Sequence, residues 1–512
     1  MSRELPVKSV IVIGGRPLSA ADVVAVARGG SNVSLAPAAR RRVERSRAAL
    51  DRALAKGRVL YGVNTGFGRL AQTRVSAEDL SALQLNLIRS HAAGTGAPLP
   101  DDVVRAILLL RAASLSWGYS GVRPTSLDTL VEAINRGLVP VVPSRGSVGA
   151  SGDLAPLAHI TLALLGEGRF RYRGRILSGR AALARARLRP LSLREKEGLA
   201  FINGTQAHTA LGLLALWDAY RLWEVALVAG AISTEAIQGS DVPFSRRFAD
   251  VRPHPGHRAA AARLASYLSG SGIRRAHLHC DRVQDPYSFR CQPQVMGAVK
   301  DALDYARSAL LREINSVTDN PLVDAGRGQV YSGGNFHGQP VAMVLDHLTL
   351  ALTTLANLSE RRLAALMDPT QSGLPPFLAA RPGRDSGLMI WQVTAAALAS
   401  ENKTSASPAS CDTIPTSANQ EDFVCMGMGA ALKARAALER TTQVVAIELL
   451  AGRFGIEHRK PLSCGPRLSP FVRRLRRAIP AMRADRNFQE DFRAAHALVQ
   501  SGFEGILPVE SW

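Results

Sequence analysis

The segment "PVAMVLDHLTLALTTLANLSERRL", residues 340–363, decides the fold class. Its hydrophobic residues lie all around the circumference of an α-helix, which is typical of a helix buried on several sides. Asp346, His347 and Glu360 interrupt the apolar run, whereas a membrane-spanning helix carries few or no charges. The segment therefore predicts a buried core helix rather than a membrane span.

Helical periodicity of the same kind covers most of the chain after residue 195. Long helices are expected at about 207–238, 291–317, 337–367, 388–402 and 421–451. Strand patterns are rare: "SVIVIGG" (9–15) predicts one short strand, and "RFRYRGRIL" (169–177) predicts a hairpin with its turn near Arg173-Gly174. The predicted fold class is mainly α, with a long helical bundle core and a smaller mixed N-terminal lobe. We expect the lobe at 1–200 and the bundle with the C-terminal helical region at 201–512, together one continuous unit.

The chain is strongly basic, with a formal net charge of +21 over 512 residues. Two arginine clusters, "RRRVERSR" (40–47) and "RRLRR" (473–477), have helical spacing and predict solvated helix faces. A nucleic-acid partner is the alternative, and it is disfavoured because no nucleic-acid-binding motif accompanies the charge.

Cysteine usage indicates a reducing compartment. The five cysteines are odd in number and form no C-x-x-C pair, so we expect free thiols in the cytoplasm and no disulfide framework. The N-terminal apolar run of four residues is too short for a secretory signal. "HLHC" places His277, His279 and Cys280 close together, but no fourth zinc ligand stands at a sensible distance, so no metal is expected.

A glycine-rich stretch, "SRGSVGASGDLAPLAHI" (144–160), fits none of the familiar loop motifs. A phosphate-binding P-loop needs a lysine after its last glycine, and a dinucleotide-binding loop needs G-x-G-x-x-G. A nucleophile elbow needs G-x-S-x-G, whereas Gly152 directly follows Ser151. A plain flexible turn remains the alternative to a reactive loop.

The triplet Ala150-Ser151-Gly152 has the composition for a self-modification. In a tight bend, which small side chains permit, the unhindered amide nitrogen of Gly152 can attack the carbonyl carbon of Ala150. Loss of one water closes a five-membered ring, and loss of a second from Ser151 leaves an exocyclic methylidene, a strong carbon electrophile. Asp153 is expected to assist the dehydrations and to cap the helix that follows. The positive end of that helix would withdraw electrons from the ring.

The surroundings of this triplet carry a resemblance to a known family. "GSVGASGDLAPLAH" (146–159) is similar along its length to the signature of the aromatic amino-acid ammonia-lyases, which use a self-formed 4-methylidene-imidazol-5-one (MIO) group and no external cofactor. Further matches run in the family's order from "YGVNTGFG" (61–68) to "SANQEDFV" (417–424). Within the family, the chain most closely resembles the enzymes that act on histidine.

The resemblance implies catalytic roles for three residues beside the triplet. Tyr61 matches the catalytic base, and a phenol serves as a base only where a cationic neighbour or a helix end lowers its pKa. Asn203, in "LAFINGTQ", matches the residue that hydrogen-bonds the electrophile and the substrate, although an Asn-Gly pair is otherwise a turn signal. Glu421 matches an acid that pairs with the substrate ring or takes part in proton transfer.

Other positions are implied to bind the substrate. His91 matches the residue that sorts substrates by hydrogen bonding to an imidazole or a phenol. In "VQDPYSFRCQPQ", Gln284 and Tyr287 match residues that line the MIO pocket, and Arg290 matches the arginine whose planar fork holds the substrate carboxylate. Phe336 matches an aromatic pocket wall, with core packing as the alternative.

The resemblance implies non-oxidative deamination of L-histidine to trans-urocanate and ammonia, by a homotetramer whose active sites combine residues of more than one subunit. The run Gln420-Glu421-Asp422 favours histidine as substrate, but Phe423 stands where the family pattern has histidine. A tyrosine or phenylalanine ammonia-lyase, or a 2,3-aminomutase, uses the same MIO group and remains an alternative. From another class, an inactive basic relative that binds nucleic acid also remains open.

Overall fold

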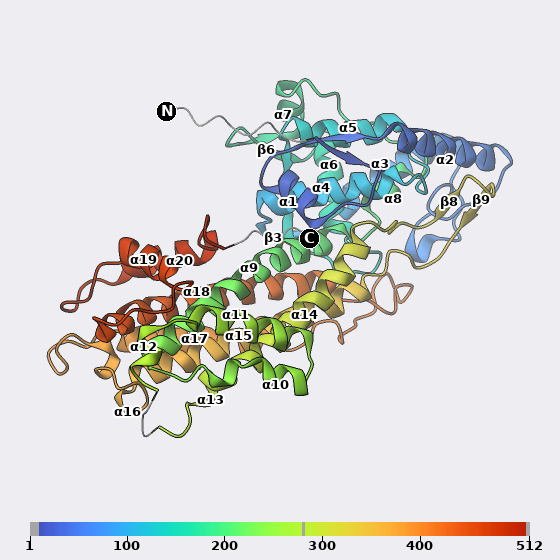
Figure 1. Cartoon of the computed structure of the whole chain (residues 1–512). Coiled ribbons are helices and arrows are strands. Elements are labelled where there is room, and N and C mark those ends of the chain that lie inside the picture. The colour runs from blue at the N-terminus through green and yellow to red at the C-terminus, as the bar shows by residue number, and fades with distance from the viewer. Residues whose placement is uncertain (1–9, 279–281, 508–512) are drawn as a thin grey trace.

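The computed structural model describes residues 10–278 and 282–507 and confirms a mainly α-helical fold. In this part of the chain, strands occur only in small sheets of two or three strands. Figure 1 shows an upper region built mostly from N-terminal segments and a lower region of long helices. Strands β8 (Leu322–Asp324) and β9 (Gln329–Tyr331) return to the upper region, where Val323 packs with Leu50 of helix α2 (Pro37–Ala55).

Long helices form a bundle in the lower region of Figure 1. They are α9 (Gln206–Ala236), α14 (Gln292–Glu313), α15 (Gln339–Met367), α17 (Met389–Ser405) and α18 (Gly427–Gly455). Helix α18 contacts α15, α9 and α17, and α14 contacts α15 and α9. Nearly every side chain of α9 is buried, because neighbouring helices surround it.

Helix α15 carries the segment that predicts a core helix. By length and composition it could cross a membrane, yet 72% of its most apolar window is buried inside the fold. Its acidic residues are paired, Asp346 with Lys433 at 3.0 Å and Glu360 with Arg361 at 2.5 Å. The prediction of a buried helix over 340–363 is therefore confirmed.

A buried ion pair connects helices of the bundle. Arg362 of α15 donates to Glu448 of α18 through Nε at 2.6 Å and Nη2 at 2.7 Å, and both side chains are fully buried. The hydroxyls of Ser233 in α9 and Ser359 in α15 donate to the same carboxylate at 2.8 and 2.6 Å. One carboxylate thus links three helices.

The expected helix at 421–451 begins later than predicted, because α18 starts at Gly427. Met426 has a left-handed backbone with φ of 51°, which ends the helical path in the N-terminal direction. Its amide donates to the carbonyl of Val148 at 2.9 Å. The residues before α18 therefore form a loop that contacts the glycine-rich stretch.

Three of the small strands, β1, β6 and β7, follow the predicted sequence patterns. Strand β1 (Val10–Ile13) lies in "SVIVIGG" and pairs in parallel with β2 (Asn32–Leu35). Strands β6 (Arg169–Tyr172) and β7 (Arg175–Ser178) form the predicted hairpin, and its turn residues Arg173 and Gly174 both have positive φ. The predicted strand and hairpin are confirmed.

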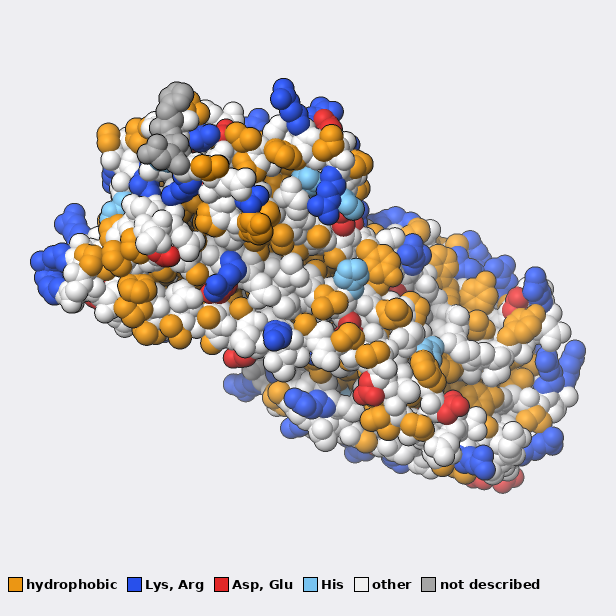
Figure 2. Space-filling view, turned by 90° about the horizontal axis from the view of Figure 1, so that it is seen from below, with side chains coloured by type: hydrophobic (Ala, Val, Ile, Leu, Met, Phe, Trp, Pro, Cys, Tyr) orange, Lys and Arg blue, Asp and Glu red, His pale blue; other side chains and the backbone are white. Residues whose placement is uncertain are grey.

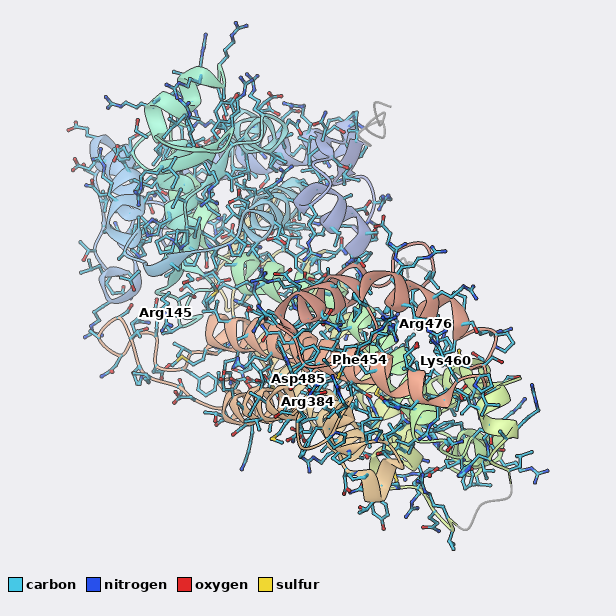
Figure 3. All side chains as sticks on the ribbon, turned by 90° about the vertical axis from the view of Figure 1, so that its left-hand side faces the viewer. Arg145, Arg384, Phe454, Lys460, Arg476 and Asp485 are labelled. Atoms are coloured by element: carbon cyan, nitrogen blue, oxygen red, sulfur yellow. The ribbon has the colours of Figure 1, made fainter. Side chains whose placement is uncertain are left out.

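The arginine cluster near the C-terminus lies on the solvent side of helix α19 (Ser469–Ala478). Phe471, Val472 and Leu475 are buried, whereas the arginines at 473, 474, 476 and 477 are exposed. Arg476 and Lys460, labelled in Figure 3, both pair with Glu457, at 2.6 and 2.5 Å. On the face shown in Figure 2, Lys and Arg side chains are spread over both regions rather than gathered into one stripe.

Candidate active site

The glycine-rich stretch forms a tight loop between strand β5 (Pro143–Arg145) and helix α6 (Leu154–Leu164). Gly149 and Gly152 have φ of 74° and 72°, and bridges within the loop connect Gly149 and Ala150 with Gly152. A Cβ at Gly152 would lie 2.2 Å from the carbonyl oxygen of Gly204, and one at Gly149 would lie 2.3 Å from Sγ of Cys425. Only glycine fits these two positions, so the backbone of the triplet is held in a sharp bend.

Asp153 is the N-cap residue of helix α6, but its side chain makes no capping hydrogen bond, so the expected side-chain cap is wrong. Its buried carboxylate accepts hydrogen bonds from the backbone amides of Ala207 and His208 at 2.9 Å each, from Nδ1 of His208 at 3.0 Å and from Oγ of Ser147 at 2.9 Å. The beginning of α9 supplies free amides and an imidazole at one point, and these compete successfully with the amides of α6. Burial raises the pKa of Asp153, but His208 and Ser147 lower it more, so the carboxyl titrates below its ordinary 3.8.

His208 occupies a narrow slot beside the loop. A Cβ at Gly338 would lie 2.6 Å from its Cε1 and Nε2, and one at Gly427 would lie 3.1 Å from its Cγ and Nδ1. Gly338 precedes α15 and Gly427 begins α18, so the amino ends of α9, α15 and α18 meet here. Burial lowers the pKa of His208, but the charge and hydrogen bond of Asp153 outweigh it and hold the pKa above 6.5.

A cavity of about 440 Å³ opens in front of the loop. Ser151 lines it together with Tyr61, His91 and Glu421, so four of the predicted site residues share one space. The remaining wall is mostly apolar and includes Phe67, Leu70, Leu83, Leu87, Leu154, Leu199 and Ile202. An apolar cavity with a few convergent polar groups is typical of a small-molecule site.

Glu421 is the acid among the residues that line the cavity. Oγ of Ser151 donates to Oε1 of Glu421 at 3.4 Å. The other carboxylate oxygen, Oε2, accepts from Oγ1 of Thr416 at 3.0 Å and from Oγ of Ser417 at 2.8 Å. One oxygen is therefore held by the loop of Glu421 itself, while the other faces Ser151.

Tyr61 and His91 line the same cavity as Glu421. The hydroxyl of Tyr61 accepts from the amide of Gly68 at 3.2 Å, yet burial and the charge of Glu421 raise its pKa above 10.0. The expectation that a cation or helix end lowers this pKa is wrong for the single chain. Burial lowers the pKa of His91 below 6.5, which keeps its imidazole neutral at neutral pH. Its Nδ1 lies 3.0 Å from Oγ of Ser90.

Asn203 lies behind the loop and does not line the cavity. It directly follows helix α8 (Glu197–Ile202) and precedes Gly204, whose carbonyl accepts from the amide of Asp153 at 2.7 Å. Its Nδ2 donates to the carbonyl of Asn320 at 2.9 Å. Its Oδ1 is buried and has no hydrogen-bond partner among the described residues.

Comparison with known proteins connects this geometry to a family. The sequence profile of the aromatic amino acid lyases matches residues 18–477. The chain belongs to the aromatic amino acid lyase family.

Curated relatives of this lyase match it over nearly its full length. Histidine ammonia-lyase of Anaeromyxobacter sp. (strain K) is 50% identical over 501 residues, which cover 96% of this chain and 99% of that protein. Histidine ammonia-lyase of Stigmatella aurantiaca is 49% identical over 490 residues, covering 96% of each.

Solved structures show the same fold as this lyase. Histidine ammonia-lyase from Trypanosoma cruzi superposes with a TM-score of 0.90 at 38% identity, covering 96% of this chain and 94% of that one. Tyrosine aminomutase from Streptomyces globisporus superposes with a TM-score of 0.92 at 35% identity, covering 96% and 97%. The expected fold class and the expected class of enzyme, an ammonia-lyase, are confirmed.

The family is the MIO-dependent class of lyases, and the loop of this chain has features that suit such a group. The residues Ala150, Ser151 and Gly152 are small, and the bridge between Ala150 and Gly152 marks a backbone that folds back on itself. Gly204 packs against Gly152 so closely that a side chain there is excluded. The sharp bend that cyclisation requires is therefore built into the loop of this lyase.

The segment 284–290 lies elsewhere in the chain. Tyr287 and Arg290 belong to the short helix α13 (Tyr287–Arg290), which packs on α14 and α15 in the lower region of Figure 1, away from α3 (Leu80–His91), α6 and α8. None of Gln284, Tyr287 and Arg290 lines the cavity at Ser151. Tyr287 is 72% exposed, and the guanidinium of Arg290 lies 4.2 Å from the centre of its ring.

Two aromatic residues also lie outside the cavity lining. Phe336 is half-buried in the loop before α15. Phe423, which departs from the family pattern, is exposed and stacks on His337 with 5.9 Å between the ring centres. In a single chain, neither ring faces Ser151.

Sequence reasoning missed most of the cavity wall. Leu83, Asn86, Leu87 and Ser90 line the cavity with His91 and all lie on helix α3. Their spacing of three and four residues places them on one side of that helix. Extending the prediction from His91 backward at this spacing would have found them.

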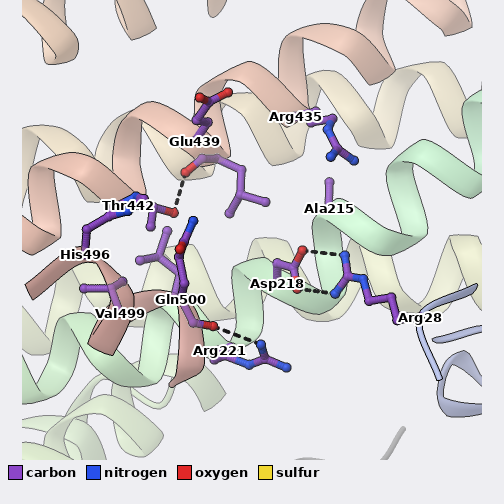
Figure 4. Close-up of a pocket in the computed structure, with 12 residues that line it drawn as sticks. Arg28, Ala215, Asp218, Arg221, Arg435, Glu439, Thr442, His496, Val499 and Gln500 are labelled. Carbon is purple, nitrogen blue, oxygen red and sulfur yellow. Dashed lines mark hydrogen bonds and ion pairs between the residues drawn. The ribbon is translucent and has the colours of Figure 1, made fainter. Parts of the chain in front are cut away.

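A second cavity, of about 500 Å³, lies among α9, α18 and α20 (Gln489–Ser501) and is shown in Figure 4. Arg28 donates to both carboxylate oxygens of Asp218 at 2.7 Å, and Nη1 of Arg221 donates to the carbonyl of Gln500 at 3.1 Å. None of the loop residues lines this space. This cavity is larger than the one at Ser151, so cavity size alone does not mark the reactive site.

Residues 10–278 and 282–507 contain no group of three or more His, Cys, Asp or Glu side chains arranged to hold a metal ion. His279 and Cys280 of the "HLHC" segment lie outside the described residues. Within them, Cys291, Cys411, Cys425 and Cys464 are free.

Proposed function

We propose that this lyase is a histidine ammonia-lyase, which converts L-histidine to trans-urocanate and ammonia. The reaction breaks the Cα–N bond and removes one proton from Cβ, so the substrate loses only ammonia. The observation that carries the proposal is the carboxylate of Glu421, 3.4 Å from Oγ of Ser151, in one cavity with Tyr61 and His91. The names of the relatives at about 50% identity support the same substrate.

We propose that Ala150, Ser151 and Gly152 condense to the MIO group with loss of two waters. When present, the group supplies an electrophilic carbon that takes up the substrate amine and turns it into a good leaving group. Asp153 assists this maturation by holding the loop in its bend. A carboxylate that already accepts four hydrogen bonds is better placed to anchor than to exchange protons.

The residues of the cavity then divide the work of binding and proton transfer. Glu421 and the neutral imidazole of His91 hold the substrate ring, because a carboxylate accepts and an imidazole can donate or accept. The apolar wall excludes water and turns Cβ toward the phenol of Tyr61, which removes the proton. Asn203 hydrogen-bonds the reacting groups from behind the loop.

We further propose a homotetramer in which a second copy of the chain completes each cavity. Gln284, Tyr287, Arg290 and Phe336 do not line the cavity of their own chain. The arginine that does line it, Arg69, is exposed, whereas the resemblance gives the substrate carboxylate to Arg290. The raised pKa of Tyr61 supports this, because an added cation would lower it toward the working range of a base.

In the proposed enzyme, residues 1–200 form a lobe with the reactive loop and Tyr61, and 201–512 form the bundle and C-terminal helical region, as one catalytic unit. Its free thiols in the described residues suit a reducing cytoplasm.

Intact-mass measurement tests the proposal first. The purified chain is expected to be lighter than its sequence mass by two waters, and Ser151→Ala is expected to restore the full mass except for the substituted oxygen. Since Ser151 supplies the electrophilic carbon, this variant should lose roughly a thousandfold or more in kcat. Ser308→Ala, at an exposed position of α14, is the matched control and should keep both mass deficit and activity.

Separate incubation with histidine, tyrosine and phenylalanine tests the substrate. Urocanate from histidine alone is the expected result. The likeness to tyrosine aminomutase makes a tyrosine or phenylalanine ammonia-lyase or a 2,3-aminomutase the second candidate, and cinnamate-type or β-amino products would establish it. A chain of full mass with no product would favour an inactive basic relative that binds nucleic acid.

A further inference from the structure

A further buried ion pair lies beside Asn203, the residue before Gly204. Nζ of Lys196 donates to Oδ2 of Asp319 at 2.7 Å, and both side chains are fully buried. Burying two charges is costly, and hydrophobic residues of similar volume often stabilise a fold as well. The pair contacts Asn203 through Oδ1 of Asp319, so it can affect the orientation of the Asn203 amide.

Asn203 is held on two sides. Its Nδ2 donates to Oδ1 of Asp319 at 3.4 Å and to the carbonyl of Asn320 at 2.9 Å. Its own carbonyl accepts from Nη1 of the buried Arg111 at 2.7 Å. The amide therefore has its nitrogen committed to the protein, whereas its buried Oδ1 has no partner in the described part of the chain.

The geometry points to Lys196 and Asp319 as positioning residues that keep Oδ1 of Asn203 free as a hydrogen-bond acceptor for the reacting groups. This inference rests on the proposed function. An ionised carboxylate can only accept, so it attracts the NH₂ end of the amide and repels the oxygen end. Lys196 binds Oδ2 of that carboxylate, so Oδ1 stays turned toward Nδ2 of Asn203.

Loss of Lys196 removes the bond that fixes the Asp319 carboxylate. Asp319 can then rotate away from Nδ2 of Asn203, and the amide can turn over. The NH₂ group of Asn203 would then occupy the position of Oδ1, which is proposed to accept a hydrogen bond from the reacting groups. Gly204, the next residue, packs against Gly152, so the altered group would stand next to the triplet.

A double-mutant cycle tests whether Lys196 acts through Asn203. Lys196→Met is made in the parent chain and in Asn203→Ala, and urocanate formation is followed chromatographically over hours. In the parent, kcat should fall at least about tenfold, since misplacement of a reacting group costs up to about a hundredfold. In Asn203→Ala, the same change should cost less than about twofold. Equal losses in both backgrounds would overturn the inference.

Two further measurements separate structure from position. Lys300→Met is the matched control, because Lys300 forms a 2.8 Å pair with Asp304 in α14, and it should leave kcat unchanged. If Lys196→Met folds poorly by its thermal midpoint, Asp319→Asn takes its place in the cycle, since an amide can also donate to Asn203. Full kcat in Asp319→Asn would contradict the inference.

Intact mass distinguishes this inference from the proposed function. A parent chain without the loss of two waters defeats the proposed function and the inference with it. If the parent chain shows the loss of two waters but Lys196→Met has equal effects in both backgrounds, only the positioning role is overturned. All the variants should keep the mass deficit, because Lys196 is proposed to act on turnover and not on maturation.

Discussion

Among single residues, the buried Asp153–His208 pair does most to shape the loop. Its carboxylate receives four hydrogen bonds, and the His208 ring fills a slot that only glycine at Gly338 and Gly427 leaves open. The pair therefore joins the loop to the amino ends of three core helices. Its charges also make its contribution to stability depend on pH.

The signs of the two shifts define the window in which the pair stabilises the fold. The pKa of Asp153 is lowered from 3.8, so its contribution is present above 3.8 and is lost as pH falls through the lowered value. The pKa of His208 is raised from 6.5, so its contribution is complete below 6.5 and is lost as pH rises through the raised value. The difference in thermal midpoint between the parent and His208→Gln should be largest between about pH 4 and 6.5.

The same comparison with His254→Gln, at an exposed position, should show no such window. A midpoint difference for His208→Gln that stays constant from pH 5 to 9 would contradict the charged pair.

The family resemblance, rather than any spacing in the chain, selects the four site residues that line the cavity. Ser151, Tyr61, His91 and Glu421 do meet at one cavity. The role of Asp153 as a helix cap was wrong, because the donors that hold its carboxylate come from residues 207 and 208. No spacing in the sequence shows that two segments so far apart will touch.

Among elements, helices α9, α15 and α18 are joined at the buried carboxylate of Glu448, and loss of its partner should destabilise the fold. Removing Arg362 leaves a buried carboxylate with only two hydroxyl donors, from Ser233 and Ser359. Arg362→Met should therefore cost about 3–5 kcal/mol in the free energy of unfolding, measured by urea denaturation.

The double variant Arg362→Met with Glu448→Leu removes both charges and should recover most of that loss. The exposed pair of Arg493 and Glu490 in α20 offers a control, and Arg493→Met there should cost less than about 1 kcal/mol. A double variant no more stable than Arg362→Met would show that the charge is not the cause.

The elements themselves were largely predictable from periodicity. Buried helices such as α9 and α15 carry apolar residues all around, and this pattern is local to each segment. The start of α18 was misplaced because "SANQEDFV" has no strong helix breaker. The residues before Gly427 instead place Glu421 against Ser151 and the amide of Met426 against Val148, which are long-range contacts.

For the whole molecule, the decisive fact is the separation of α13 from the cavity at Ser151 within one chain. If Arg290 serves the cavity of another copy, two inactive variants should complement each other. Co-expression of Ser151→Ala with Arg290→Lys should restore about one quarter of parental activity, because random assortment pairs an intact Ser151 with an intact Arg290 at one site in four. Activity is measured as urocanate formed per chain.

As a control, the same two variants are purified separately and then mixed. Stable oligomers exchange no chains, so the activity of the mixture should stay low. Co-expressed activity equal to the sum of the two single variants would place Arg290 and Ser151 in the same chain.

The dependence of the loop on distant segments also determines when, during synthesis of the chain, the bend at Ser151 can form. Gly204 covers Gly152, Cys425 packs on Gly149, and Met426 holds Val148, so the bend at Ser151 needs walls that are translated long after it. A nascent chain that ends before residue 425 lacks two of these contacts, those of Cys425 and Met426. Any chemical change in the triplet is therefore a late event in the life of the polypeptide, and a ribosome-bound fragment should still carry an ordinary serine. A modified triplet would therefore be found only in chains that had been completely translated and folded.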